Sequence, residues 1–199
     1  MENNIDKIFS FLKKAEKLKS TLRYNKNTSG RNESTADHSW RLALMVPIIT
    51  KELKMDVDIN KSIQIALVHD LAEAITGDID AIEIAEGRVS KEQKKEGELK
   101  AMEQFKQLLP IEDGNNIYSL WHEYENTSTK EGQFVKGLDK VETLLQLAET
   151  GYTCYDKPNF IVDYTEEAIK KFPEMEQLLL IIKDALKKEF IKGGFGWEK

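Results

Sequence analysis

Apolar residues recur every three or four positions along most of this chain, which is the spacing of one face of an amphipathic helix. The first stripe predicts a helix over residues 5–18, formed by Ile5, Ile8, Phe9, Leu12, Ala15 and Leu18. Lys13, Lys14 and Lys17 fall largely outside the stripe, and acidic residues are interspersed with them. This pattern favours a solvated helix face over one that lies on a membrane surface.

A polar break over residues 25–34 separates this helix from a second one. Ser34 or Thr35 can cap the second helix, because a side-chain oxygen at that position accepts a hydrogen bond from a backbone N–H of the first turn. The helix continues through residues 40–48, where Pro47 predicts a kink or a local irregularity.

A third helix is predicted over residues 63–75, with Asn60 as its cap and Gly77 as its stop. Ser90 and Gln93 then form a capping-box pattern that opens a charged helix, which ends before the next proline. The buried stripe of that helix is predicted to consist of Leu99, Met102, Phe105 and Leu109.

Further helices are predicted over residues 118–124, 134–148, 165–172 and 173–193. The buried side of the second of these is predicted to carry Phe134, Leu138, Val141, Leu145 and Ala148. Since no strand-like alternation or repeat persists, the simplest fold is an all-α bundle of roughly seven to nine helices. We expect one domain over residues 1–192 and a mobile tail over residues 193–199.

Composition and charge narrow the class of partner. Of the 199 residues, 40% are hydrophobic and 32% are charged, which is typical of a globular domain. The net charge is −6 and the isoelectric point is about 5.3. A nucleic-acid polymer is therefore not an expected partner, because its phosphates must be neutralised by lysine and arginine. A small phosphorylated ligand held by one or two arginines remains compatible with the charge.

The cysteine content and the apolar runs indicate a cellular location. Cys154 is the single cysteine, which rules out an internal disulfide and suits a reducing compartment. No apolar run reaches the roughly 18 residues of a membrane-spanning helix, and lysines interrupt the apolar residues near the N-terminus. We expect a cytoplasmic protein without a membrane partner.

The stretch LVHDLAEAITGD, residues 67–78, places ionisable side chains in a very apolar neighbourhood. On a continuous helix, with about 100° between successive residues, His69, Asp70 and Glu73 fall on one arc. Burial of such groups is costly unless they are paired or bind a metal. Imidazole and carboxylate are good ligands for a divalent cation, which would offset that cost.

Two further residues are candidates for completing this site. His38 is one of three histidines and lies in the first turns of its helix. Asp139 borders the apolar face of residues 134–148, where an unpaired carboxylate would be penalised. The order along the chain is thus His38, then the pair His69–Asp70, then Asp139. The third histidine, His122, has no motif partner and is expected at the surface or in packing.

This order of residues on helices resembles that of the HD-domain metal-dependent phosphohydrolases. The stretches LVHDLAEAITGDI and FVKGLDKVETLLQ, with LRY fifteen residues before His38, resemble the 5′-deoxynucleotidase branch, including its eukaryotic HD-domain-containing relatives. The resemblance runs from about Phe11 to about Phe172. It implies metal-dependent hydrolysis of a nucleoside 5′-monophosphate, preferentially a deoxynucleotide, to a nucleoside and phosphate.

The resemblance also implies roles for individual residues. The implied metal ligands are His38, His69, Asp70 and Asp139, and Glu73 is the implied general acid or base. The implied substrate-binding residues are Arg23, Tyr24, Arg31 and Asp78. Tyr24 stands where the bacterial enzymes of that branch carry tryptophan, which leaves the choice between ribose and deoxyribose open.

The ligand set narrows the choice of cofactor. Two imidazoles with two carboxylates favour Mn²⁺, Co²⁺, Fe²⁺ or Zn²⁺ over Mg²⁺ or Ca²⁺. One histidine beyond the H/HD pair is too few for the additional ligands of a two-metal HD phosphodiesterase, so we expect one divalent ion. Two alternatives stay open: an HD phosphohydrolase of nucleoside triphosphates or alarmones, and a non-catalytic module that senses nucleotide or metal.

The sequence leaves the oligomeric state open. The resemblance is to a family that often forms dimers. The apolar residues of the C-terminal helix exceed one narrow stripe, and they suit either a homodimer interface or a helix buried in a monomer: Leu178, Leu179, Ile181 and Ile182.

Overall fold

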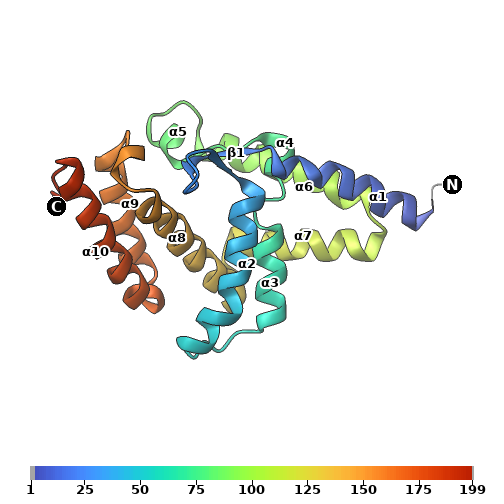
Figure 1. Cartoon of the computed structure of the whole chain (residues 1–199). Helices are drawn as coiled ribbons and strands as arrows, with labels where there is room; N and C mark the ends of the chain where they lie inside the picture. Colours follow the sequence, from blue (N-terminus) through green and yellow to red (C-terminus); the bar gives the residue numbers. More distant parts are fainter. Residues whose placement is uncertain (1–2, 199) are drawn as a thin grey trace. The chain divides into compact units, whose positions relative to one another are not determined.

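A computed structural model describes residues 3–198 of the chain, and Figure 1 labels its principal elements. The predicted all-α class is confirmed, because helices form almost all of the regular structure. The described residues divide into two compact units. The first comprises the residues up to Arg23 together with Ser34–Val135, and the second comprises Tyr24–Glu33 together with the residues from Lys136 onward. A single domain over residues 1–192 stays a prediction.

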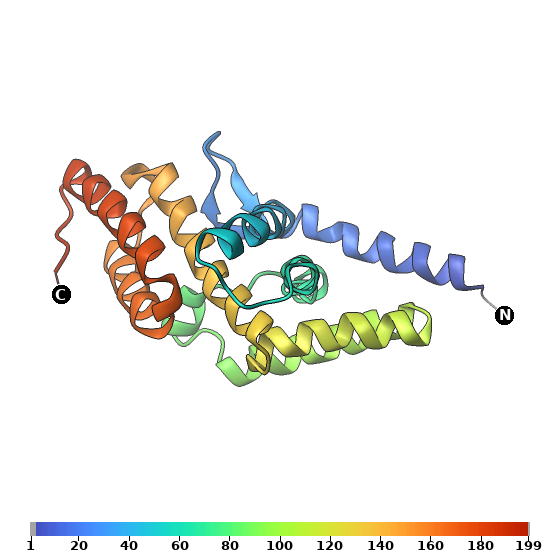
Figure 2. The same cartoon turned by 90° about the horizontal axis from the view of Figure 1, so that it is seen from below.

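The first unit is a bundle of helices. Its elements are α1 (Asn4–Ala15), η1 (Glu16–Lys19), α2 (Thr35–Glu52), α3 (Ile59–Val68), α4 (Glu73–Thr76), α5 (Ala81–Ala85), α6 (Lys91–Leu108), α7 (Ile111–Asn126) and the first turns of α8 (Lys130–Thr150). Helix α2 packs along α3, α3 packs on α7, and α6 packs on both α7 and α1, as Figures 1 and 2 show. The fully buried side chains between them include Leu42, Ile65, Met102 and Phe105.

The second unit combines a short hairpin with the C-terminal helices. Its elements are most of β1 (Leu22–Lys26), β2 (Asn32–Ser34) up to Glu33, the rest of α8, η2 (Tyr152–Cys154), α9 (Pro158–Lys171), η3 (Pro173–Met175) and α10 (Glu176–Gly193). The hairpin is bound to α8, because Asn25 donates to the carbonyl of Thr143 and Gln146 donates to the carbonyl of Lys26. Helix α10 packs on α9, with Leu179 and Leu186 fully buried.

Several helix ends follow the predicted caps. Ser34 begins α2 with a full capping box in which Asp37 is the reciprocal partner, and Ser90 does the same for α6. Gly77 follows α4 with φ 76°, a conformation that glycine adopts without strain. The predicted cap Asn60 is wrong, because Asp58 accepts the bond from the Lys61 N–H and α3 begins two residues earlier than the cap prediction implied.

The predicted helix over residues 63–75 is interrupted before the ionisable residues. Helix α3 ends at Val68, residues 69–72 form turns, and α4 begins at Glu73. Within the turn, Leu71 N–H donates to Val68 C=O and Glu73 N–H donates to Asp70 C=O, which are bonds to the third preceding residue. The chain is thus wound more tightly there than in an α-helix. A single helical wheel therefore does not describe His69, Asp70 and Glu73.

Other differences concern the extent of elements and of burial. The break over residues 25–34 contains the β1–β2 hairpin, which the apolar pattern did not predict. Helix α7 is longer than predicted. Leu99 of α6 is exposed, because the buried side of α6 is centred on Ala101, Met102 and Phe105. On α8, Leu144 and Leu147 are buried in place of the predicted Leu145 and Ala148.

The described part of the C-terminal tail contacts the second unit. The ring of Trp197 meets the ring of Phe190 edge-to-face, and its indole N–H donates to Glu166. Phe195 also packs edge-to-face on Phe190. The mobility of residues 193–199 stays a prediction. Among the helices of residues 3–198, none combines the length and the apolar character needed to cross a bilayer.

Candidate active site

The first unit brings five of the sequence-predicted site residues into one region. Arg23 comes from β1 and His38 from the first turns of α2. His69 and Asp70 lie in the turn that follows α3, and Glu73 is the first residue of α4. The early end of α3 and the capped start of α2 therefore determine where these side chains lie.

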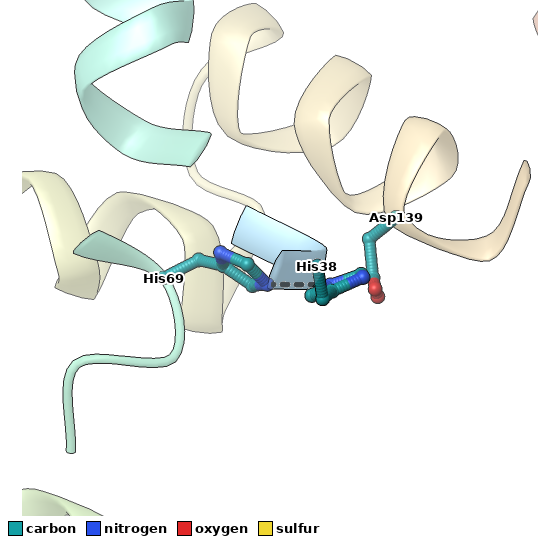
Figure 3. Close-up of side chains that lie close together, drawn as sticks. All are labelled: His38, His69 and Asp139. Carbon is teal, nitrogen blue, oxygen red and sulfur yellow. Dashed lines mark hydrogen bonds between the residues drawn. The ribbon is translucent and has the colours of Figure 1, made fainter. Parts of the chain in front are cut away.

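Three donor atoms converge at the centre of this region. His69 Nε2 lies 3.2 Å from His38 Nε2 and 2.9 Å from Asp70 Oδ2, and His38 Nε2 lies 3.8 Å from the same Asp70 oxygen. Figure 3 draws the two imidazoles, joined by the dashed line, together with the Asp139 side chain from α8. Both histidine side chains are fully buried. The Nε2 atoms of His38 and His69 and the Oδ2 atom of Asp70 thus face one point.

A backbone carbonyl determines which nitrogen of His69 faces this point with a lone pair. His69 Nδ1 lies 2.9 Å from the carbonyl oxygen of Ala66, an acceptor, so the ring proton resides on Nδ1. The edge of the His69 ring also meets Tyr124, with 4.9 Å between ring centroids. Metal-bound histidines in proteins commonly show this arrangement, in which a carbonyl holds the distal N–H and fixes the tautomer.

These residues fit a divalent cation by both donor type and spacing. A neutral Nε2 and a carboxylate oxygen 2.9 Å apart are both acceptors, so they repel unless a proton or a cation lies between them. A metal with bonds of about 2.1 Å holds neighbouring ligand atoms roughly 3 Å apart in octahedral geometry. The separations of 2.9 Å and 3.2 Å match that spacing.

Asp70 is the charged centre of the group. Burial alone would raise its pKa, but His69 and His38 when protonated, together with Arg23, outweigh burial and hold the pKa of this carboxyl below its usual value. The Arg23 guanidinium donates to Asp70 Oδ2 through Nη1 at 3.2 Å. Asp70 is therefore ionised over the physiological pH range, as a metal ligand must be.

Glu73 is a buried carboxyl whose pKa is shifted in the opposite direction to the pKa of Asp70. It is only 3% exposed, and its Oε2 accepts a hydrogen bond of 2.9 Å from the hydroxyl of Thr35, which is itself fully buried. Burial, then Asp70 and Asp78, raise the pKa of Glu73 well above its usual value, while Arg23 opposes them. Glu73 therefore keeps its proton to higher pH than an exposed glutamate does.

Asp78 and Lys94 lie at the edge of the same region. Burial raises the pKa of Asp78, with Arg23 opposing and Asp70 contributing. Lys94 of α6 donates to the carbonyl of Ile79 at 2.8 Å and therefore holds the loop that carries Asp78. Burial lowers the pKa of Lys94, but Glu98 and other carboxylates, Glu73 among them, outweigh burial and raise it.

The other predicted site residues belong to the second unit. The Tyr24 hydroxyl donates to the carboxylate of Asp156. Arg31 lies at the exposed turn of the hairpin, where it donates to the carbonyl of Asn32 at 2.9 Å. Asp139 is buried on α8 and lies 3.0 Å from the ammonium of Lys140. Their roles stay predictions.

The apolar pattern missed two residues of the first-unit region. Thr35 was considered only as a helix cap, although it is the hydrogen-bond donor to Glu73. Lys94 stands in a lysine-rich stretch in which nothing distinguishes it from Lys91 or Lys95. Its hydrogen bond to the Ile79 carbonyl identifies it. His122 is exposed, which agrees with the expectation that it lies at the surface.

Comparison with known proteins identifies the family of this chain. Residues 15–176, most of the chain, match the HD domain family. The chain belongs to the HD-domain family. Its predicted metal-binding residues His38, His69, Asp70 and Asp139 all fall within the matched region.

Relatives of this HD-domain chain include named enzymes. It is 40% identical to the human 5′-deoxynucleotidase HDDC2 over 152 aligned residues, and the aligned part covers 75% of this chain and 70% of that protein. It is 33% identical over 196 residues to the 5′-deoxynucleotidase HDDC2 of Danio rerio, which is 96% and 93% of the two chains. A crystal structure described as a predicted metal-dependent phosphohydrolase, from Magnetospirillum magnetotacticum MS-1, superposes with a TM-score of 0.79 at 26% identity, covering 98% of this chain and 100% of that one.

Proposed function

We propose that this chain is a metal-dependent phosphomonoesterase that hydrolyses deoxynucleoside 5′-monophosphates to a nucleoside and phosphate. The observation that carries the proposal is the convergence of two imidazoles and one carboxylate beside the buried carboxyl of Glu73. The similarity to relatives named 5′-deoxynucleotidases supports the same reaction and substrate class.

We assign Asp139 as the fourth protein ligand, beside His38, His69 and Asp70. Helix α8 runs without interruption from the first unit into the second, and Asp139 follows the buried Val135 by about one helical turn. The ammonium of Lys140 lies 3.0 Å from Asp139 Oδ2 and offsets part of the cost of burying this carboxylate. Four nitrogen and oxygen ligands leave positions for water and a phosphate oxygen on a six-coordinate ion.

The residues of the site would have separate roles in the reaction. A divalent cation bound at this site would polarise the phosphoryl group and lower the pKa of a water molecule. Arg23, positively charged beside Asp70, would stabilise the charge of the phosphate. Glu73, which Thr35 orients and whose pKa burial raises, would supply the proton that the departing 5′-oxygen requires.

The remaining assigned residues would bind the substrate. Asp78 follows the Gly77 turn and is held near Glu73 by the Lys94 contact to the loop. Tyr24 has its hydroxyl bound to Asp156, so its aromatic ring is the part that we assign to packing near the sugar. Arg31 would contribute a second positive charge. Whether Tyr24 separates deoxyribose from ribose is decided by the substrate comparison below.

We propose Mn²⁺, Co²⁺, Fe²⁺ or Zn²⁺ as the cofactor, because two imidazoles bind these ions better than they bind Mg²⁺ or Ca²⁺. The single cysteine supports a cytoplasmic location, since a chain with one cysteine needs no oxidising compartment. We also propose that the chain forms a homodimer.

The test is a phosphate-release assay on the purified full chain, stripped with a chelator and reloaded with one metal at a time. We expect release from deoxynucleoside monophosphates, and comparison with the ribonucleotides measures the sugar preference. Bound metal without release from any monophosphate would overturn the proposal and would favour a sensing module. Release from triphosphates or alarmones alone would favour a different HD phosphohydrolase.

A further inference from the structure

Lys94 of α6 carries a partly buried positive charge at the edge of the proposed site. Its side chain is 28% exposed. Burial alone would lower the pKa of Lys94, but Glu98, Glu73 and further carboxylates outweigh burial and raise it, so the side chain is an ammonium at physiological pH. A charge that is withdrawn from water is costly unless hydrogen bonds replace its hydration.

The packing of α6 against α4 brings Lys94 to this position. Gly97 of α6 faces Thr76 of α4, and a Cβ atom added at Gly97 would lie 3.6 Å from the Thr76 methyl group. Lys94 lies about one helical turn before Gly97 and reaches the loop that follows α4. There its ammonium donates to the Ile79 carbonyl at 2.8 Å, which holds the positive charge beside the loop that carries Asp78.

The ammonium of Lys94 has more hydrogen-bond donors than the protein uses. A lysine carries three N–H donors, and among residues 3–198 the Ile79 carbonyl accepts the one hydrogen bond that Lys94 makes. Glu98 Oε1 lies 3.6 Å from Lys94 Nζ, which is too far for a hydrogen bond although the two charges attract. Two donors of this cation therefore have no acceptor in the described part of the chain.

The proposed site needs positive charge beyond that of Arg23. A phosphate monoester carries between about 1.5 and 2 negative charges at pH 7, and the carboxyl groups of Asp70, Glu73 and Asp78 act on one another in the same region. Arg23 already donates to Asp70 at 3.2 Å, so its charge is partly neutralised before a substrate binds. Lys94 is a further cation of the first unit that acts on both Glu73 and Asp78.

We propose that Lys94 binds the phosphate group of the substrate directly, with its two remaining N–H donors on phosphate oxygens. The inference rests on the proposed function, because it assigns part of the monophosphate to a residue that the sequence pattern did not single out. Lysine is a common phosphate ligand, since its ammonium is a compact charge with donors that rotate to suit the anion. Two cations, Arg23 and Lys94, then hold the phosphate.

A purely structural role for Lys94 explains less of this arrangement. One hydrogen bond to the Ile79 carbonyl holds the loop, and an uncharged donor would make that bond at a lower cost of burial. Lys94 also lies about one turn from the N-terminus of α6, near the positive end of the helix dipole, where a cation is disfavoured and an anion is favoured. A bound phosphate offsets both costs, because it supplies acceptors and negative charge.

The test is isothermal titration calorimetry of the full chain loaded with one equivalent of Mn²⁺. The probes are inorganic phosphate and deoxyadenosine, which are products of the proposed reaction and are not consumed during the measurement. Lys94→Met should weaken phosphate binding by roughly 10- to 100-fold, because it removes charge-assisted hydrogen bonds. It should leave the affinity for deoxyadenosine unchanged. Lys94→Arg, which keeps the charge, should retain most of the affinity for phosphate.

Two further variants control for surface charge and for folding. Lys95 is the exposed neighbour of Lys94 on the same helix, so Lys95→Met should leave the binding of both probes unchanged. The double variant Lys94→Met/Glu98→Gln removes both members of the ion pair and does not leave a buried carboxylate without its cation. It should show the same loss of phosphate affinity as Lys94→Met. Circular dichroism verifies that each variant is folded.

The proposal fails on any of three results. One is a phosphate affinity that neither variant of Lys94 to methionine changes, which would leave Lys94 with a structural role. Another is an equal loss in Lys95→Met, which would make the effect one of general surface charge. The third is an equal loss of affinity for deoxyadenosine, which would show that the site had rearranged.

The binding measurement separates this inference from the proposed hydrolysis. A chain that binds phosphate through Lys94 but releases none from any monophosphate would overturn the hydrolysis alone. A chain that hydrolyses monophosphates but binds phosphate equally well with and without Lys94 would overturn the inference alone.

Discussion

Burial of the Glu98 carboxyl on α6 should make the stability of the fold depend on pH. The Glu98 side chain is 11% exposed, and the ammonium of Lys94 lies 3.6 Å away. Burial raises the pKa of Glu98 from 4.5 to about 7, with Lys94 opposing the rise. The folded protein therefore holds this proton more tightly than the unfolded chain does.

The sign and the size of the effect follow from this shift. Because the pKa is raised on folding, the stabilisation by bound proton is fully present below pH 4.5 and is lost as the pH rises through about 7. One pKa unit corresponds to about 1.4 kcal/mol, so the shift from 4.5 to about 7 amounts to about 3 kcal/mol. At mildly alkaline pH, ionised Glu98 thus costs the fold up to that amount.

The measurement is urea unfolding of the wild type and of Glu98→Gln at several pH values between about 4.5 and 8. The amide cannot ionise, so the difference in unfolding free energy between the two proteins isolates the titration of Glu98. We expect Glu98→Gln to gain stability relative to the wild type as the pH rises, by about 3 kcal/mol in all.

Glu96→Gln is the matched control on the same helix. Glu96 is exposed, and its hydrogen bond with Lys100 lowers the pKa of its carboxyl. This variant should show no gain with rising pH. A difference between the wild type and Glu98→Gln that does not change with pH would refute the reasoning, because Glu98 would then titrate alike in the folded and unfolded chains.

Three further predictions concern the proposed site. Glu73→Gln should keep the metal, measured by elemental analysis, but lower kcat by roughly 100-fold or more; full activity would exclude Glu73 as proton donor. His38→Ala should abolish the rise in Tm that added Mn²⁺ gives the wild type, and an undiminished rise would exclude His38 as a ligand. Lys94→Met should speed hydrogen exchange at residues 78–80, because it removes the contact to the Ile79 carbonyl, whereas Lys95→Met should not; equal exchange in both variants would contradict that role.

The helical fold could be predicted from the sequence where interactions between residues close together in the chain determine the structure. The capping boxes at Ser34 and Ser90 involve residues within one turn of each other, so sequence is enough to identify them. The buried face of α6 could not be predicted as well, because α6 packs against several helices, and this packing leaves Leu99 exposed. The β1–β2 hairpin is held by the side chains of Asn25 and Gln146, which carry no apolar signal.

The candidate site was predicted through residue type more than through geometry. The wheel that placed His69 and Asp70 on one arc assumed a continuous helix, yet α3 ends at Val68. Their convergence with His38 arises from the turn after α3 and from packing of α2 on α3. Thr35 and Lys94 escaped detection because their contacts join segments far apart in sequence.

The end of α3 at Val68 has an electrostatic consequence for the proposed cation. The backbone dipoles of an α-helix add up to a partial negative charge at its C-terminus, where the last carbonyl groups lack helical partners. The turn places His69 and Asp70 at that end of α3, and the Ala66 carbonyl there accepts the His69 N–H. A cation beside them would gain about 0.3–1 kcal/mol from the helix itself, before any ligand is counted. A helix that ran on through residues 69–72 would carry its negative end past the site.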